Sequence, residues 1–427
     1  MRGTMRWVAT AVLLGAVTLA ARPADAQSLS AEDVGAALLE RPDVRRALDE
    51  VRRLEPETLE TQVALSEIPA PPFAETERGR RLAELFRAAG LQNVRTDEAG
   101  NVVAERPGLA ERPHVLMTAH LDTVFPEGTD VSVTRAGTEL RGPGVGDDAR
   151  GLAVLVAVAG ALEAADVQTA GQLTFVGTVG EEGLGDLRGV KQLFAGEFRE
   201  GVDAFVSIDG SGLGITHVGV GSRRYRVTFT GPGGHSYGDF GMPNPVHALG
   251  RAISSLADFQ VPPSPRTTFS VGRVGGGTSI NAIAYEAWME VDLRSSDRGA
   301  LSNLDERFRA AVATAVDLER RRWNDQKPLE VTVETVGDRP AGATPREASI
   351  VRAAVSVTEA LGAPTVLMEG STDANLPMSL DVPAITIDGG GEGSGSHSLE
   401  EVFDFNESWR GTQRALLLAV ALTEELQ

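Results

Sequence analysis

Apolar residues follow two different spacings along this chain. Up to about residue 214 they occur either with helical periodicity or in short continuous runs. The helical spacing predicts helices at 29–65, with Ser30 as the N-cap, and at 75–89, before Gly90. A long apolar helix is expected from Ala149 onward, and buried strands are expected in the runs NVVAER, HVLMTAH, QLTFVGTV and AFVSIDG. Because strands that alternate with helices form parallel sheets, these elements predict an α/β fold with a mainly parallel sheet sandwiched by helices.

The spacing changes in the region 217–335. SRRYRVTFTG, RTTFSVGRV and AYEAWMEVDLRS alternate apolar and polar residues, as half-buried antiparallel strands do. Helices are expected among them at 245–258 and 300–322. The first pattern then returns, with a helix at 346–361, strands in TVLME and PAITI, and a helix from about residue 406. We therefore predict one α/β domain in two segments, 27–216 and 336–427, interrupted by a small α+β domain at 217–335.

Residues 1–26 have the layout of a secretory signal peptide. Two arginines precede an apolar run, residues 7–21, that is too short for a comfortable transmembrane span. Ala24-Asp25-Ala26 is an A-x-A cleavage site, so the mature chain is expected to begin at Gln27. The alternative is an uncleaved membrane anchor. The signal peptide predicts an exported protein, periplasmic or extracellular, that is free of the membrane after cleavage.

Composition narrows the choice of partners and ligands. The formal net charge of −20 argues against nucleic acid or an anionic membrane surface as the main partner, because both attract basic proteins. The chain has no cysteine, which excludes disulfides and thiolate metal ligands. Any metal must therefore be held by histidine, aspartate and glutamate side chains.

Histidine and carboxylate residues follow the predicted strands at their carboxyl ends, where open α/β sheets carry their ligand crevice. Glu181 and Glu182 directly follow one such strand, and two buried carboxylates side by side repel each other unless a cation neutralises them. For Asp147 and Asp148, helix capping explains one of the two acids. The other residues of this kind are His120, Asp122, Asp209 and, in a glycine-rich loop, His397. Such ligands suit zinc, with manganese or cobalt as alternatives.

In this order, HLDT, GPGVGDDARG, TVGEEG, Asp209 and GSHSLEE resemble the co-catalytic dizinc exopeptidases and aminoacylases. That family includes tripeptidase T, carnosinase, aminoacylase and succinyl-diaminopimelate desuccinylase. The resemblance covers nearly the whole mature chain. It implies a metallopeptidase or amidohydrolase that cleaves a small peptide or an N-acyl amino acid at an amide bond near a free carboxylate.

The resemblance also implies a role for each residue of the site. His120 and Asp209 bind one zinc ion, Glu182 and His397 bind a second, and Asp147 bridges the two. Asp122 lies behind His120 and fixes its ring. Glu181 is the general base, which takes a proton from the attacking water and passes it to the leaving nitrogen.

The inserted region resembles the lid domain through which members of this family dimerise. By this resemblance His235, in GPGGHSYGDFG, reaches the active site of a partner chain in a homodimer and stabilises the oxyanion. Asn281 and Arg294 contact the carbonyl and the carboxylate of the substrate. One departure is Ala149-Arg150-Gly151, where the family often has a lysine followed by glycines.

Two other interpretations stay open on the sequence. A related dizinc aminopeptidase architecture has a similar order of ligands but no lid, and the insert argues against it. A non-catalytic peptide- or zinc-binding protein on the same fold is the alternative from a different functional class. That alternative predicts loss of Glu181 or of a ligand, whereas all of these residues are present.

Overall fold

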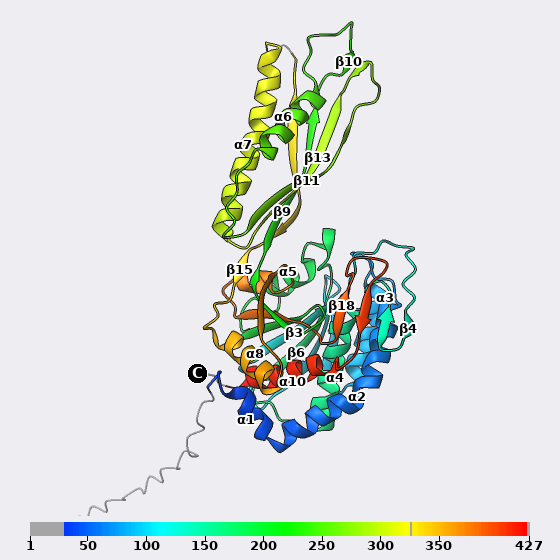
Figure 1. The fold of residues 1–427 in the computed structure, drawn as a ribbon, viewed down its shortest axis with the longest axis vertical. Helices are drawn as coiled ribbons and strands as arrows, with labels where there is room; N and C mark the ends of the chain where they lie inside the picture. The colour runs from blue at the N-terminus through cyan, green and yellow to red at the C-terminus, as the bar shows by residue number, and fades with distance from the viewer. Residues whose placement is uncertain (1–29, 325–326, 425–427) are drawn as a thin grey trace, which may run out of the picture.

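The computed structural model describes residues 30–324 and 327–424, which form two lobes (Figure 1). The lower lobe contains a nine-stranded sheet, and the upper lobe contains a four-stranded sheet. The predicted signal peptide, residues 1–26, lies outside the described residues. Among the helices of the described residues, none is long and apolar enough to cross a membrane.

The centre of the lower sheet is parallel. Its strands lie in the order β1-β2-β6-β3-β7-β17-β8-β15, and β16 also pairs with β8. Neighbouring strands from β6 to β17 are parallel, whereas the pairs β1–β2, β2–β6, β17–β8 and β8–β15 are antiparallel. The strands are β1 (Gln92–Thr96), β2 (Val102–Arg106), β3 (His114–His120), β6 (Gln172–Thr178), β7 (Ala204–Ile208), β8 (Gly214–Gly219), β15 (Gly342–Ala343), β16 (Val366–Gly370) and β17 (Ala384–Ile387).

Helices cover both faces of this sheet, which explains why its central strands are continuously apolar. Val115 and Met117 of β3 belong to the larger core, and Leu116 between them belongs to the core on the other face. The helices of the larger core are α1 (Val34–Glu40), α2 (Pro42–Ser66), α3 (Thr76–Ala88), α4 (Ala149–Ala164), α8 (Ser349–Ala360) and α10 (Trp409–Thr423). The opposite face carries α5 (Arg188–Ala195) and α9 (Asn375–Ser379). The predicted α/β sandwich is confirmed.

The first helical segment differs from its prediction. The expected single helix at 29–65 is two helices, α1 and α2, which are separated at Arg41. Arg41 is extended, with φ −75° and ψ 123°, because the ring of Pro42 disfavours the helical conformation in the preceding residue. The predicted N-cap was also wrong, since α1 has Asp33 rather than Ser30 at that position.

The upper lobe is built on an antiparallel sheet with the strand order β11-β13-β9-β14. Alternate residues of β13 are buried under the two helices of the lobe, which confirms the half-buried strands expected here. The lobe begins at Gly221 and ends at Arg339, whereas the sequence placed the insert at 217–335. Its main elements are β9 (Gly221–Thr230), α6 (Pro245–Ala257), β11 (Thr267–Gly276), β13 (Glu286–Ser295), α7 (Arg298–Arg322) and β14 (Glu330–Arg339).

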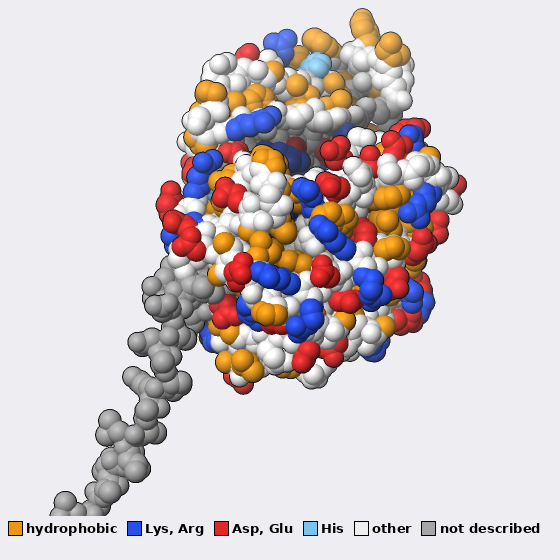
Figure 2. Space-filling view, turned by 60° about the horizontal axis from the view of Figure 1, so that its bottom comes forward, with side chains coloured by type: hydrophobic (Ala, Val, Ile, Leu, Met, Phe, Trp, Pro, Cys, Tyr) orange, Lys and Arg blue, Asp and Glu red, His pale blue; other side chains and the backbone are white. Residues whose placement is uncertain are grey.

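Charged side chains are spread over the one face of the lower lobe that Figure 2 draws. On the face drawn in Figure 2, acidic and basic residues are interspersed. The net charge of −20 is therefore not gathered into a single patch on this face.

Candidate metal centre

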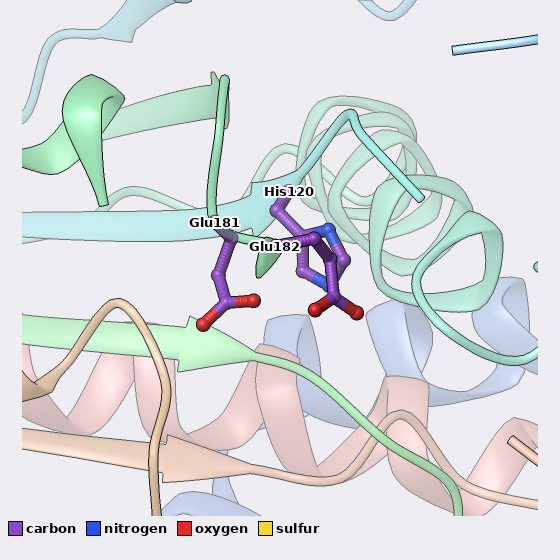
Figure 3. A group of neighbouring side chains, drawn as sticks. All are labelled: His120, Glu181 and Glu182. Atoms are coloured by element: carbon purple, nitrogen blue, oxygen red, sulfur yellow. The ribbon is translucent and has the colours of Figure 1, made fainter. Parts of the chain in front are cut away.

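The carboxyl ends of the central parallel strands meet at one edge of the sheet and deliver charged side chains to the same cleft. His120 is the last residue of β3, Asp209 directly follows β7, and Glu181 and Glu182 follow β6. Figure 3 shows the side chains of His120, Glu181 and Glu182 turned toward a common space. The cleft has a volume of about 730 Å³ and lies between these strand ends and the foot of the upper sheet.

Two loops complete this group. β5 (Glu139–Arg141) leads into the loop that carries Asp147, and β18 (Glu392–Ser394) and β19 (Val402–Asp404) flank the loop that carries His397. β19 pairs with β5, which brings the two loops side by side in a small sheet with β4 (Thr134–Ala136). His397 has a φ of 66°, in the left-handed region that residues other than glycine seldom adopt.

Asp147 lies between the two histidines and directs one carboxylate oxygen to each. Its Oδ1 is 3.0 Å from Nε2 of His120, and its Oδ2 is 3.1 Å from Nε2 of His397. His397 Nε2 is also 2.8 Å from Oε1 of Glu182, and His120 Nε2 is 4.0 Å from Oδ1 of Asp209. The side chains form three overlapping groups that could hold a metal ion: His120, Glu181 and Glu182; His120, Asp147 and Asp209; and Asp147, Glu182 and His397. Asp147 belongs to the last two of these groups.

The carboxylates of this group stabilise positive charge close to them. Burial is the largest single influence on the pKa of His120 and acts to lower it, but hydrogen bonds to Asp122 and Asp147 outweigh burial and raise that pKa well above its usual value. Hydrogen bonds to Asp147 and Glu182 raise the pKa of His397 to about 10. The carboxylates therefore stabilise positive charge on both rings. Histidine nitrogens and carboxylate oxygens in these groups are suitable ligands for divalent cations.

Asp122 and Asp148 support this group from behind. The backbone carbonyl of Asp122 lies 2.9 Å from Nδ1 of His120, while its nearer carboxylate oxygen is 3.7 Å from that nitrogen. The Asp122 carboxylate instead accepts the backbone N–H groups of Glu181 and Glu182, at 2.9 and 2.8 Å. Asp148 caps α4 through the N–H of Gly151 and accepts the N–H of His120. Asp122 therefore fixes the glutamate pair as well as the histidine.

Residues 116–421, a range that contains every candidate ligand, match the sequence profile of Peptidase family M20/M25/M40. The chain belongs to this family. It is accordingly a hydrolase, either a peptidase or an amidohydrolase.

Several related proteins and solved structures match this chain over most of its length. A Mycobacterium tuberculosis protein described as a candidate succinyl-diaminopimelate desuccinylase, DapE, is 27% identical over 358 residues, which are 80% of this chain and 92% of that protein. The structure resembles the aminopeptidase PepT of Bacillus cereus, with a TM-score of 0.70 and 20% identity over 88% of this chain and 99% of that one. It also resembles Bacillus subtilis YxeP, described as a dinuclear metal binding peptidase, with a TM-score of 0.66 and 19% identity over 88% of this chain and all of that one.

Glu181 is deeply buried beside the candidate ligands. Burial raises the pKa of its carboxyl group to about 8, Arg339 opposes this shift, and Glu182 adds to it. The Arg339 guanidinium lies 2.9 Å from Oε1 of Glu181. Nothing in the local sequence singled out Arg339, because the contact joins the ends of two strands that lie far apart in the chain.

Arg294 lines the same cleft, together with two residues that sequence patterns did not identify, Arg224 and Asp292. The Asp292 carboxylate accepts hydrogen bonds from Nε–H of Arg294, at 2.7 Å, and from Nε–H of Arg224, at 3.4 Å. Both guanidinium groups are thereby held at the foot of the upper sheet, facing the candidate ligands. The register of β9 against β13 explains this, since Arg224 lies directly opposite Asp292.

The structure does not bring His235 and Asn281 to this cleft. His235 ends β10 (Gly234–His235), which pairs with β12 (Ala282–Ile283) at the far end of the upper lobe (Figure 1). Ser236 donates its backbone N–H to the carbonyl of Asn281, so the two predicted residues are neighbours of each other. Neither lines the cleft within one chain, as far as the described residues define it.

Proposed function

We propose that this protein is an exported zinc-dependent hydrolase that cleaves an amide bond, in a small peptide or an N-acyl amino acid, near a free carboxylate. The observation that carries the proposal is the position of Asp147, whose two carboxylate oxygens face His120 and His397 separately. This is the arrangement expected of a carboxylate that bridges two metal ions. The relatives described as an aminopeptidase and as a candidate desuccinylase support both substrate classes.

In this proposal His120 and Asp209 would hold one zinc ion, Glu182 and His397 would hold the other, and Asp147 would be shared by the two sites. Cobalt or manganese are the alternative metals, because they accept the same nitrogen and oxygen ligands. When bound, two such ions acidify a water molecule and polarise the carbonyl group of the scissile amide.

The protein's own residues then move the proton and orient the substrate. Glu181 takes the proton from the attacking water and delivers it to the leaving nitrogen. Asp122 keeps the Glu181–Glu182 turn in place through the two N–H groups that it accepts. Arg294, held by Asp292, binds the substrate carboxylate with its outer N–H groups, and Arg224 adds positive charge beside it.

His235 and Asn281 act from a second copy of the chain in this proposal. Their place at the tip of the upper lobe, away from the cleft of their own chain, supports a homodimer in which each tip reaches the partner's cleft. There His235 stabilises the oxyanion and Asn281 contacts the substrate carbonyl.

The test is to purify the chain from Gln27, count the bound metal ions, and assay dipeptides, tripeptides and N-acyl amino acids. We expect about two zinc ions per chain and hydrolysis that is lost on chelation and restored by zinc. Glu181→Ala should bind the same metal but lose turnover. Peptide or zinc binding without hydrolysis would favour the alternative, a non-catalytic binding protein on the same fold.

A further inference from the structure

A buried ion pair joins the candidate base to the upper lobe. Glu181 follows β6 in the lower lobe, whereas Arg339 is the last residue of β14 in the upper sheet. One Arg339 nitrogen, Nη1, donates to Oε1 of Glu181 at 2.9 Å, and the other, Nη2, donates to the backbone carbonyl of the same residue. Each side chain is only 5% exposed. Arg339 therefore holds Glu181 by its side chain and its backbone together.

Further contacts fasten the segment after Glu181 to β9 and β14, two strands of the upper sheet. Arg224 of β9 donates to the carbonyl of Gly183 at 3.0 Å. The backbone N–H of Asp338, in β14, donates to the Asp186 carboxylate at 2.8 Å, and Lys191 donates to the Asp338 carbonyl at 2.9 Å. β9 and β14 are the strands by which the chain enters and leaves the upper lobe. The turn that carries the glutamate pair is thus attached to the two strands that connect the lobes.

We propose that Arg339 is a positioning residue for Glu181, and that it links the position of this carboxylate to the orientation of the upper lobe. The inference rests on the proposed role of Glu181 as the base. A carboxylate transfers a proton efficiently only when it is held within hydrogen-bond reach of the water. Arg339 occupies Oε1 and so leaves the second oxygen, Oε2, to accept that proton.

The test compares Arg339→Ala and Arg339→Lys with the unaltered zinc-loaded enzyme on its best amide substrate. We expect Arg339→Ala to lower kcat by about 100-fold, the lower end of what a general base contributes, with KM and zinc content nearly unchanged. Arg339→Lys should recover part of the loss, because one ammonium group can reach Oε1 but cannot hold the carbonyl as well. Guanidinium chloride at low concentration should partly restore Arg339→Ala.

A double-mutant cycle gives the sharpest readout. If Arg339 acts through Glu181, the variant Glu181→Ala/Arg339→Ala should be no slower than Glu181→Ala alone. Arg223→Ala is the matched control. Arg223 lies on β9 opposite Asp338, the residue before Arg339, and it forms an ion pair with Asp305 at 2.9 Å rather than with Glu181. This variant should keep its turnover. Thermal unfolding of each variant separates loss of folding from loss of positioning.

Two results would overturn the inference while leaving the proposed function intact. Additive losses in the double variant would mean that Arg339 acts independently of Glu181. A rise in KM with unchanged kcat would mean that Arg339 binds the substrate directly. Full turnover in Glu181→Ala would instead remove both the base assignment and the role of Arg339.

Discussion

Asp147 and Glu401, 254 residues apart in the chain, are joined by a hydrogen bond of 3.0 Å from the backbone N–H of Asp147 to Oε1 of Glu401. The Glu401 carboxylate also accepts the N–H groups of Gly144 and Gly146, both at 2.8 Å. Glu401 is almost fully buried. One side chain thus fixes the loop that presents the proposed bridging ligand.

Replacing Glu401 by alanine is expected to destabilise the protein and weaken metal binding. The change leaves two buried N–H groups and one partly buried N–H group without their acceptor, and each buried group left in this way costs about 1–3 kcal/mol of unfolding free energy. We expect a lower midpoint of thermal unfolding and fewer than two zinc ions per chain. Glu400→Ala is the control, since Glu400 is exposed next to it in the sequence. Equal stability of the two variants would show that Glu401 does not hold the loop.

Loss of a bridging ligand should differ from loss of a terminal one. We expect His397→Ala to retain about one metal ion per chain and Asp147→Ala to retain almost none, because Asp147 belongs both to the group with His120 and to the group with His397. Metal analysis after exhaustive dialysis gives the comparison. His247→Ala, which changes an exposed histidine of the upper lobe, should keep both ions. One ion left in Asp147→Ala would argue against bridging.

The sequence alone predicted much of the lower lobe and the residues gathered in the cleft, for a physical reason. Parallel strands end at one edge of a sheet, so acids and histidines at successive strand ends must lie together. For this reason the sequence placed His120, Glu181, Glu182 and Asp209 together at one edge of the sheet. The helix break at Arg41 was missed, although Pro42 carries a signal for it in the sequence.

The residues that were missed depend on contacts between distant segments. Arg339 reaches Glu181 only because β14 returns from the upper sheet to the edge where β6 ends. Glu401 holds Asp147 only because β19 pairs with β5. Arg224 enters the cleft through the register of β9 against β13. Local spacing along the chain carries no information about any of these pairings.

Because His235 lies at the tip of the upper lobe, its replacement tests directly whether one subunit contributes to catalysis in the other. We expect His235→Ala to lower turnover by about 100-fold, as loss of one oxyanion donor does, with normal metal content. A mixture with Glu181→Ala should then regain activity, because a mixed dimer contains one site with both residues intact. Random pairing of equal amounts predicts recovery of about a quarter of the wild-type activity.

The controls for this experiment are the two variants assayed separately at the same total concentration. Co-expression with two different tags would isolate the mixed dimer and remove the dependence on subunit exchange. Absence of any recovery in the isolated mixed dimer would rule out the cross-subunit role of His235.

Arg294 offers a test of what the cleft recognises. If its outer N–H groups bind a substrate carboxylate, Arg294→Ala should lower kcat/KM by about 10- to 100-fold, the value of one charge-assisted, two-point contact. The loss should nearly disappear for the same substrate with that carboxylate converted to an amide. Arg294→Lys should fall between, because lysine keeps the charge but not the paired donors. Equal losses on the charged and the blocked substrate would mean that Arg294 shapes the cleft through Asp292 instead of binding the carboxylate.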